Sequence, residues 1–367
     1  MHPDDTRRTL TMTRTVGIIG AGQLGMMLGQ AARKLGITCI FLDPSDRPPA
    51  REQGEQIQAA FDDAAAIATL AAQVDVVTYE FENVPVTAVR AIGNSTPVFP
   101  PAEALETAQD RLSEKRLFET LKIPLPAYRA VDSRDDLERA ADALGLPFVL
   151  KTRRFGYDGK GQFVVRRSDE LSAAWEELGG QALIAEAWVA FDYEVSIIVT
   201  RGADGDVALY PLTRNSHSDG ILDTSVAPLD NDSLEALAAN YGRRLVDHFA
   251  YVGTVALELF VVGDRLLANE FAPRVHNSGH WTIEGTDCSQ FENHLRAVTG
   301  SPLGNPQATA YAGMKNLIGR MPGGQFDGIH DYGKSERPGR KLGHITVTAS
   351  TAEVRDDLLQ DISRRLA

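Results

Sequence analysis

The stretch that most constrains this chain is a predicted β-hairpin with an acidic residue in each strand. Glu258 lies in an apolar run, Gly263–Asp264 is a dipeptide suited to a tight turn, and Asn269 and Glu270 lie in the returning segment. A two-residue loop would place Glu258 opposite Asn269, whereas a three-residue loop would place it opposite Glu270. Because cross-strand neighbours lie about 4.5–5.5 Å apart, either register brings two carboxylates and an amide oxygen close together.

Such a set of oxygen atoms on a stiff hairpin suits Mg²⁺, which usually takes one or two carboxylates and completes its shell with water and substrate phosphate. The simpler alternative is a hairpin with two acids on its solvent-exposed face. Three hydrogen-bond donors, Arg274, His276 and Asn277, follow the acids directly. This donor cluster favours a site where an anion meets a metal ion.

The composition is that of a globular protein with two or three domains. Hydrophobic residues make up 43% of the 367 residues, and 37 basic against 50 acidic residues give a net charge of −13. An acidic chain binds nucleic acid poorly, so an anionic substrate requires a local cationic pocket. Cys39 and Cys288 have no metal-type spacing, and no apolar run could span a bilayer. We therefore expect a reduced, cytoplasmic protein without nucleic-acid or membrane partners, with residues 1–13 as a disordered extension.

The first part of the chain is predicted to be a βαβ unit. A strand at residues 15–19 precedes the turn GAGQLG at residues 20–25, and after a helix a second strand at residues 37–42 ends at Asp43. This pattern matches the dinucleotide fingerprint. A glycine turn before a helix can equally bind another phosphate ligand, or it can be purely structural.

The chain after the next predicted strand, residues 74–79, departs from the pattern of a dinucleotide-dependent dehydrogenase. Glu80 follows this strand directly, where carboxylates in open sheets either bind ligands or are simply solvated. Predicted helices at residues 109–121 and 132–144 then replace the further βαβ units that a dehydrogenase requires.

A strand, a glycine-rich loop and another strand are predicted at residues 148–165. The glycines of the loop leave backbone N–H groups free to wrap a phosphate, while Lys151 and Lys160 supply positive charge. Such a loop suits a lid that closes over a nucleotide and excludes water. An ordinary glycine hairpin is the alternative.

Two further polar segments lie in the second half of the chain. Residues 215–220 are predicted to be a polar loop, in which His217 is more simply a surface histidine than a catalyst. Near the C-terminus, Lys334, Arg337, Arg340 and Lys341 concentrate positive charge in an acidic protein. These residues indicate either a phosphate-monoester pocket, for which arginine is well suited, or a solvated basic loop.

Taken together, the motifs resemble those of the ATP-grasp enzymes, and more narrowly those of the N5-carboxyaminoimidazole ribonucleotide synthetase family. The resemblance runs from about residue 16 to the C-terminal helix. It rests on the motifs TYEFENV (78–84), GYDGKGQ (156–162), APRVHNSGHW (272–281), NLIG (316–319) and RPGRKLGH (337–344).

This resemblance implies a mixed α/β and α+β chain with the three-domain ATP-grasp fold. The expected domains are a Rossmann-like preATP-grasp domain at residues 14–108, a lid domain at 109–193 and a C-terminal catalytic domain at 194–367. The implied reaction is the ATP- and bicarbonate-dependent carboxylation of 5-aminoimidazole ribonucleotide through carboxyphosphate, in de novo purine synthesis. Two Mg²⁺ ions (or Mn²⁺), a homodimer and a separate mutase that receives the product are also implied.

Other functions are weighed against this one. Another ATP-grasp carboxylase or a formate-using ligase is the nearest alternative. An NAD(P)-dependent dehydrogenase is more distant, because the glycine-rich loop and the acidic pair have no part in its chemistry. A non-catalytic nucleotide sensor is disfavoured by the full set of phosphate- and metal-binding residues.

The family pattern also implies roles for individual residues. The nucleotide-binding candidates are Arg111, Lys151, Gly156, Tyr157, Asp158, Gly159, Lys160, Gly161, Gln162, Glu186, Ala187, Trp188, Val189, Glu194, His217, Asn269 and Glu270. Glu258 and Glu270 are the metal ligands, and Arg274, His276, Asn277 and Lys151 are the catalytic candidates. The candidates for binding the ribonucleotide substrate are Gln23, Leu24, Glu80, Tyr157, Asp158, Arg274, Lys334, Arg340 and Lys341.

Overall fold

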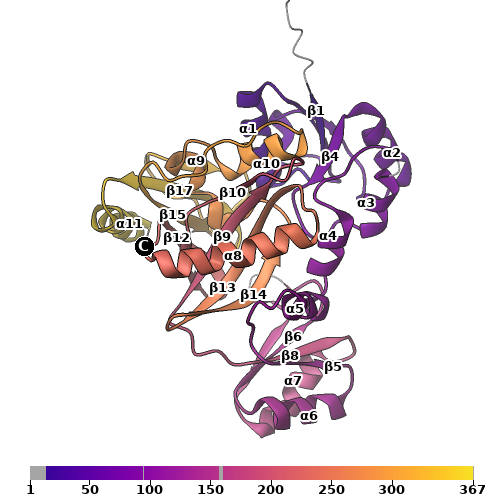
Figure 1. Cartoon of the computed structure of the whole chain (residues 1–367), viewed down its shortest axis with the longest axis vertical. Coiled ribbons are helices and arrows are strands. Elements are labelled where there is room, and N and C mark those ends of the chain that lie inside the picture. Colours follow the sequence, from indigo (N-terminus) through magenta and orange to yellow (C-terminus); the bar gives the residue numbers. More distant parts are fainter. Residues whose placement is uncertain (1–13, 94, 157–159, 367) are drawn as a thin grey trace, which may run out of the picture.

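The computed structural model describes residues 14–93, 95–156 and 160–366, which form three β-sheets with helices packed against them (Figure 1). The expected extension at residues 1–13 and the lid residues Tyr157, Asp158 and Gly159 lie outside the described residues. Within the part that is described, no helix is both long enough and apolar enough to cross a membrane.

The N-terminal sheet confirms the predicted βαβ unit and has four parallel strands in the order β3-β2-β1-β4. Its strands are β1 (Thr15–Ile19), β2 (Thr38–Leu42), β3 (Glu55–Ile57) and β4 (Val76–Tyr79), and the helices nearby are α1 (Gln23–Leu35), α2 (Ala64–Gln73) and α3 (Val86–Ile92). Helix α1 buries Leu24, Met27 and Leu28 in the core, because apolar residues three and four positions apart share one helix face.

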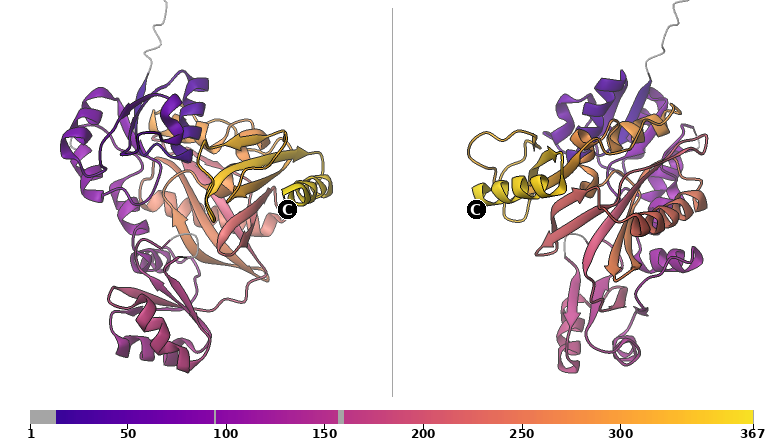
Figure 2. Two further views of the ribbon diagram at one scale, coloured as in Figure 1. Left: turned by 180° about the vertical axis from the view of Figure 1, so that it is seen from behind. Right: turned by 60° about the vertical axis from the view of Figure 1, so that its left-hand side comes forward.

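A second four-stranded sheet, which is antiparallel and has the order β5-β8-β6-β7, lies at the opposite end of the molecule (Figures 1 and 2). Its strands are β5 (Tyr128–Val131), β6 (Phe148–Thr152), β7 (Gln162–Val165) and β8 (Leu183–Ala187), with helices α6 (Arg134–Leu144) and α7 (Leu171–Leu178). Helix α5 (Arg111–Thr120) precedes this sheet and begins at the N-cap Asp110, whose side chain accepts hydrogen bonds from two backbone N–H groups. The predicted strand–loop–strand segment is thus confirmed.

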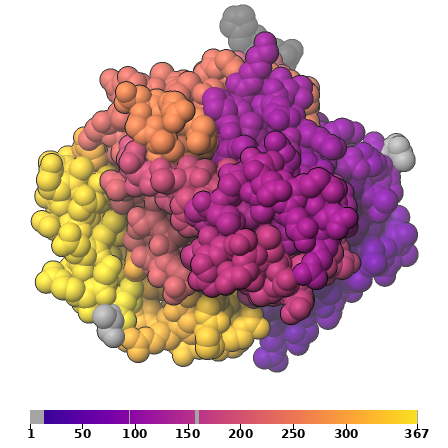
Figure 3. All heavy atoms as spheres, turned by 90° about the horizontal axis from the view of Figure 1, so that it is seen from below, coloured from indigo at the N-terminus to yellow at the C-terminus, as the bar shows by residue number. Residues whose placement is uncertain are grey.

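The largest sheet has nine strands, eight of them in the order β14-β13-β9-β11-β12-β15-β17-β16, with β10 paired to β9. Its strands are β9 (Tyr193–Arg201), β10 (Val207–Leu209), β11 (Thr213–Ser218), β12 (Ile221–Ala227), β13 (Gly253–Val262), β14 (Arg265–Ala272), β15 (Tyr311–Ile318), β16 (Ile329–Asp331) and β17 (Lys341–Ala349). Figure 3, viewed from the end that carries the antiparallel four-stranded sheet, shows that sheet lying in front of the large one.

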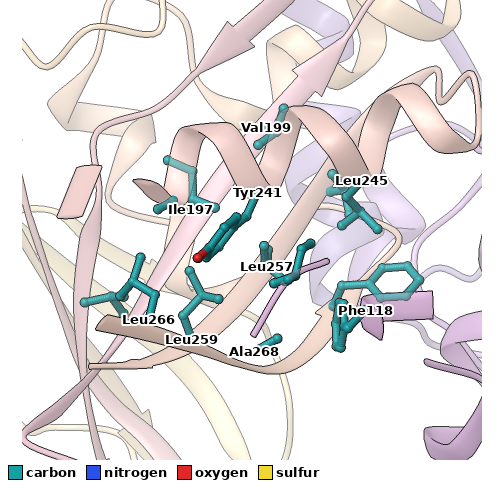
Figure 4. Close-up of a cluster of buried hydrophobic side chains, with 14 of the residues drawn as sticks. Phe118, Ile197, Val199, Tyr241, Leu245, Leu257, Leu259, Leu266 and Ala268 are labelled. Carbon is teal, nitrogen blue, oxygen red and sulfur yellow. The ribbon is translucent and has the colours of Figure 1, made fainter. Parts of the chain in front are cut away.

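Helix α8 (Asp232–His248) covers one face of the large sheet. Its Tyr241 and Leu245 point toward Ile197 of β9 and Leu257 of β13 (Figure 4). Burial of these side chains holds β13 and β14 firmly, so the hairpin that they form is a stiff support for a site. The remaining elements are η1 (Pro49–Glu52), α4 (Ala102–Ala108), η2 (Ser168–Glu170), η3 (Asn277–Gly279), α9 (Thr282–Gly285), α10 (Gln290–Val298) and α11 (Ala352–Leu366).

The segment at residues 215–220 was wrongly predicted as a loop. Strand β11 continues to Ser218 and pairs with β9 and β12, and only Asp219 and Gly220 form the turn. The segment lacks apolar alternation because its buried side chain is Asn215, which is satisfied by hydrogen bonds to two serines instead of by apolar contacts.

Candidate active site

The hairpin of β13 and β14 brings its two acidic residues directly opposite each other. Val262 pairs with Arg265, so the loop has two residues, but the register shifts beside Glu258 and pairs Glu258 with Glu270. Asn269 is therefore the extra residue of a β-bulge. The expectation that a two-residue loop would pair Glu258 with Asn269 was wrong, because a bulge changes the register without changing the loop.

Each carboxylate of this pair also contacts a cationic or hydrogen-bonding side chain. Glu258 Oε1 lies 3.2 Å from His276 Nε2, and Glu270 Oε2 lies 2.7 Å from Arg111 Nη1. Burial would raise the pKa of Glu258, but the hydrogen bond from His276 and the nearby His217 and Arg274 outweigh it and lower the pKa to about 2. Glu258 is therefore ionised at neutral pH, as a metal ligand must be.

The donor set of the hairpin fits Mg²⁺. The described residues contain no group of three or more His, Cys, Asp or Glu side chains arranged to hold a metal ion. Two opposed carboxylates are nevertheless a common protein contribution to a Mg²⁺ site, where water and substrate phosphates complete the shell. The backbone oxygen of Asn269 is engaged by the Lys115 ammonium group.

Three basic side chains gather beside the hairpin. Lys115 Nζ and Lys151 Nζ lie 3.4 Å and 3.0 Å from the same oxygen of Glu186, Oε2. Burial favours the neutral acid, but Lys115, Lys151 and Arg111 outweigh it and lower the pKa of Glu186 to about 2. The cluster retains net positive charge next to the carboxylate pair, and such a pocket suits a polyphosphate.

Two buried residues at this cluster, Lys115 and Glu114, were given no site role by the sequence reasoning. Lys115 is 0% exposed and lies one helical turn after Arg111 on α5, and that four-residue spacing was the available signal. Glu114 is also buried and accepts a 2.6 Å hydrogen bond from the Phe271 backbone N–H. Burial raises the pKa of Glu114 to about 8, so this side chain is neutral at pH 7.

The glycine-rich loop begins where β6 ends and returns into β7. Gly161 has a φ of 70°, and a Cβ atom there would lie 2.7 Å from Thr152 Oγ1, so glycine is required. Gly156, Lys160 and Gln162 lie in the same segment. Arg153 at the base of this loop forms a bidentate ion pair with Asp110, at 3.0 Å and 2.7 Å, which ties the loop to the helix that carries Arg111.

The segment after β8 is the predicted adenine edge. Ala187 ends β8, and Trp188 and Val189 follow it, with Trp188 49% exposed. Glu194 at the start of β9 is engaged by the His217 imidazole from β11. Burial lowers the pKa of His217, but Glu194 more than compensates and raises it. His217 therefore has a partner in Glu194, another of the predicted nucleotide-binding residues, and is not an isolated surface histidine.

The donors that follow the hairpin are each held by a partner. Arg274 forms a bidentate ion pair with Glu82, in which Nη2 lies 3.0 Å from Oε1. Asn277 and Asn316 exchange two amide hydrogen bonds of 3.1 Å and 2.8 Å. The sequence analysis assigned no individual role to Glu82 or Asn316, although both lie within the motifs quoted above, because their partners depend on long-range contacts.

The first glycine turn is filled by a side chain of the protein itself. Glu80 accepts hydrogen bonds from the backbone N–H groups of Gly22 and Gly25 at the start of α1. Cβ atoms at Gly20 and Gly22 would lie 2.4 Å and 2.6 Å from Glu80 atoms. Asp43, the acid of the fingerprint, accepts a 2.9 Å hydrogen bond from Ala21 N–H.

This arrangement gives the turn a structural explanation that does not involve a dinucleotide. The glycines make room for the Glu80 carboxylate, which takes the place that a pyrophosphate takes in dinucleotide-binding proteins. The structure therefore disfavours the dehydrogenase alternative.

The basic C-terminal segment reaches this same turn. The Lys334 ammonium group contacts Gln23 Oε1, while Arg340 Nη1 donates a 2.8 Å hydrogen bond to Ser335 Oγ. Burial and the neighbouring Arg340 lower the pKa of Lys334 to about 8. Leu24 is buried in α1, and Lys341 begins β17. The structure thus brings Gln23, Glu80 and Lys334 together from three distant parts of the sequence.

Comparison with known protein families and structures identifies the family of the chain. Residues 12–109 match the ribonucleotide synthetase preATP-grasp domain, 116–291 the ATP-grasp domain, and 312–357 the phosphoribosylaminoimidazole carboxylase C-terminal domain. These matches confirm the predicted three-part ATP-grasp fold.

Individual relatives cover nearly the whole chain. The N5-carboxyaminoimidazole ribonucleotide synthase of Pseudomonas aeruginosa is 48% identical over 90% of this chain and 94% of its own length. The crystal structure of the corresponding synthetase from Thermus thermophilus has a TM-score of 0.91 at 47% identity, covering 95% of this chain and 98% of that one. The Aspergillus clavatus synthase, in complex with ADP and 5-aminoimidazole ribonucleotide, has a TM-score of 0.88 at 31% identity, covering 96% and 98%.

Proposed function

The chain belongs to the N5-carboxyaminoimidazole ribonucleotide synthase family of ATP-grasp enzymes, and from this premise we propose that it uses ATP and bicarbonate to carboxylate 5-aminoimidazole ribonucleotide. The activity is that of a ligase which forms a C–N bond in de novo purine synthesis. The observation that carries this proposal is the pairing of Glu258 with Glu270 beside the cluster of Arg111, Lys115 and Lys151.

The acidic pair and the basic cluster have complementary roles in this proposal. Arg111, Lys151 and the glycine-rich loop hold the ATP phosphates, with Gly156, Lys160, Gly161 and Gln162 as the described part of that loop. Glu186 and residues 187–189 lie at the adenine edge, and Glu194 with His217 meets the ribose. Glu258 and Glu270 would hold two Mg²⁺ ions, which supply neutralisation of the charge on the triphosphate and its leaving group.

Bicarbonate is a weak nucleophile and must be held in line with the γ-phosphorus. Arg274, His276 and Asn277 follow the metal ligands in sequence and supply the donors. A bicarbonate oxygen attacks the γ-phosphorus, ADP leaves, and carboxyphosphate forms. The amine of the aminoimidazole then attacks the carboxyl carbon and expels inorganic phosphate, or it attacks the CO₂ that carboxyphosphate releases together with inorganic phosphate. In either route the amine nitrogen gives up a proton as the C–N bond forms. Because carboxyphosphate hydrolyses readily, the loop must also exclude water.

The ribonucleotide is proposed to bind between the first glycine turn and the basic segment. Lys334, Arg340 and Lys341 hold its 5′-phosphate beside Gln23 and Leu24, while Glu80 meets the ribose or the imidazole. The family pattern adds Tyr157 and Asp158, which lie outside the described residues. This arrangement is supported by the contact between Lys334 and Gln23.

The location of the enzyme, its oligomeric state, the transfer of its product and its domain boundaries are also proposals. We expect a cytoplasmic homodimer that hands its product to a separate mutase, and light scattering of the purified chain tests the dimer. Domain boundaries at residues 108 and 193 are proposed likewise, and limited proteolysis tests them.

The decisive experiment follows ¹⁸O from labelled bicarbonate. If bicarbonate attacks the γ-phosphorus, one labelled oxygen appears in inorganic phosphate, and ADP release requires bicarbonate and rises with 5-aminoimidazole ribonucleotide. Unlabelled phosphate would refute the carboxyphosphate route. Formate offered in place of bicarbonate separates this activity from that of a formate-using ligase, since only the latter would turn over.

A further inference from the structure

A continuous chain of buried hydrogen bonds leads across the large sheet to His276. Ser225 Oγ donates to Asn215 Oδ1 at 2.8 Å, Asn215 Nδ2 donates to Ser196 Oγ at 3.1 Å, and Ser196 Oγ donates to Ser278 Oγ at 2.7 Å. Ser278 Oγ lies 2.8 Å from His276 Nδ1. The three serines are 0% exposed and Asn215 is 3% exposed, so water does not compete for these bonds.

The direction of the chain follows from the chemistry of its members. An amide NH₂ group can only donate a hydrogen bond and an amide oxygen can only accept one. Asn215 therefore fixes which partner is the donor in the hydrogen bonds on both of its sides. At the other end, the backbone N–H of Ser278 lies 3.3 Å from His276 Nδ1 and can only donate. His276 Nδ1 is therefore an acceptor without a proton, and the Ser278 hydroxyl donates to it as well.

The other nitrogen of His276 consequently carries the proton. In a neutral imidazole one nitrogen donates and the other accepts, so Nε2–H is the donor and points to Glu258 Oε1, 3.2 Å away. The partner of the second nitrogen commonly sets which tautomer a histidine adopts.

We propose that the chain of Ser225, Asn215, Ser196 and Ser278 holds His276 as its neutral Nε2–H tautomer, so that the side of the imidazole facing Glu258 is always a hydrogen-bond donor. The four members are positioning residues, because they act through His276. This inference deepens the proposed function, since it assigns a supporting structure to one of the proposed bicarbonate donors.

Sheet stability alone gives a poor explanation of the chain. Four hydroxyl and amide side chains within a protein core cost free energy unless every bond is made, and alanine or an apolar residue would fill the same positions. The chain crosses β12, β11 and β9 and then reaches η3, ending on a residue of the site. It thus connects three strands of the large sheet to one imidazole.

The tautomer can be measured in the full-length protein without substrate, by ¹⁵N NMR of protein labelled at its histidine nitrogens. The His276 signals are assigned by their loss in His276→Gln. We expect an unprotonated Nδ1 and a protonated Nε2 in the wild type. In Ser278→Ala the backbone N–H of residue 278 remains as the longer, 3.3 Å donor, so we expect the Nε2–H tautomer to stay in the majority and a measurable fraction with a protonated Nδ1 to appear. Ser196→Ala and Asn215→Leu are expected to cause smaller shifts in the same direction.

A matched control is available on the same strand. Thr200 of β9 is also 0% exposed and forms a 2.7 Å hydroxyl hydrogen bond with Thr254, whose hydroxyl donates to the backbone oxygen of Gln290 and not to the His276 imidazole. Thr200→Val removes that bond, so it should lower stability as a serine variant does but leave the His276 signals unchanged. In turnover, Ser278→Ala should lose about 10- to 100-fold in kcat, the size expected for loss of an outer-shell partner.

Three outcomes would overturn the proposal: a protonated Nδ1 in the wild type, wild-type signals in Ser278→Ala, or the same shift in Thr200→Val. The NMR result stands apart from the proposed activity. If the wild type shows the Nε2–H tautomer but no bicarbonate-dependent turnover, the proposed function fails while the tautomer assignment remains.

Discussion

The carboxylate of Glu80 accepts a hydrogen bond from the backbone N–H of Gly22, at the first turn of α1. The two residues are 58 positions apart, and β4 and β1 bring them together as neighbouring parallel strands. A turn whose sequence matches a dinucleotide fingerprint is therefore filled by an anion from within the chain.

Gly22→Ala should destabilise the protein, because the new Cβ atom would lie 2.6 Å from Glu80 Oε1. We expect a loss of about 1–3 kcal/mol in the free energy of unfolding, typical of overpacking, measured by urea denaturation. Gly93→Ala is the control, since its Cβ atom would meet nothing closer than 3.6 Å. In a Glu80→Ala background the Gly22→Ala loss should shrink, and an unchanged loss would contradict the explanation.

Glu270→Ala should reduce ATP turnover by about 100-fold or more, as expected when a group that holds catalytic metal ions is removed. The expected melting temperature is close to that of the wild type, because Glu270 is partly exposed. Asp264→Asn, at the exposed turn of the same hairpin, should retain activity. Near-normal ADP release by Glu270→Ala would refute the metal assignment.

Lys115→Met tests the buried basic cluster. Loss of this ammonium leaves Glu186 with fewer cations, and breaking a buried ion pair costs about 3–5 kcal/mol. Because Lys151 still pairs with Glu186, we expect the loss in the free energy of unfolding to lie at the lower end of that range. Arg116→Met, on the exposed face of the same helix, should change stability by less than about 0.5 kcal/mol. Because Glu186→Gln removes the uncompensated charge, it should restore part of the loss when combined with Lys115→Met.

Lys334 should make kcat/KM for the ribonucleotide substrate depend on pH. Its pKa is lowered to about 8 by burial and by Arg340, so its positive charge is present below that pH and lost above it. kcat/KM for 5-aminoimidazole ribonucleotide should fall as pH rises through about 8, because this parameter reports groups of the free enzyme. In Lys334→Arg the fall should move to higher pH, since arginine stays charged. A profile unchanged by Lys334→Arg would contradict this role.

Glu114 should make stability depend on pH. Its pKa is about 8 in the folded chain against 4.5 for an ordinary glutamate. A raised folded-state pKa means that its contribution to stability is fully present below pH 4.5 and is lost as pH rises through 8. Glu114→Gln remains neutral, so its stability relative to the wild type should increase steadily between pH 5 and 8.5. A difference that stays constant with pH would count against this assignment.

Local patterns in the sequence predicted most of the fold. The strand at Thr15–Ile19, the helix that follows it and the hairpin around Gly263 were all expected, and all are present. These elements could be predicted because apolar spacing and turn residues act over a few positions. The polar strand β11 could not, because its buried Asn215 depends on partners from other strands.

The sequence by itself determined which residue types are available for chemistry and in what order, and its motifs identified the family. Only the tertiary structure decided which of these residues meet. The bulge at Asn269 set the partner of Glu258, and Lys334 met Gln23 across 311 positions. The physical reason is that strand register and long-range contacts depend on how whole sheets pack. A single inserted residue or a buried carboxylate can change which side chains meet, and the spacing of residues along the chain does not reveal such contacts.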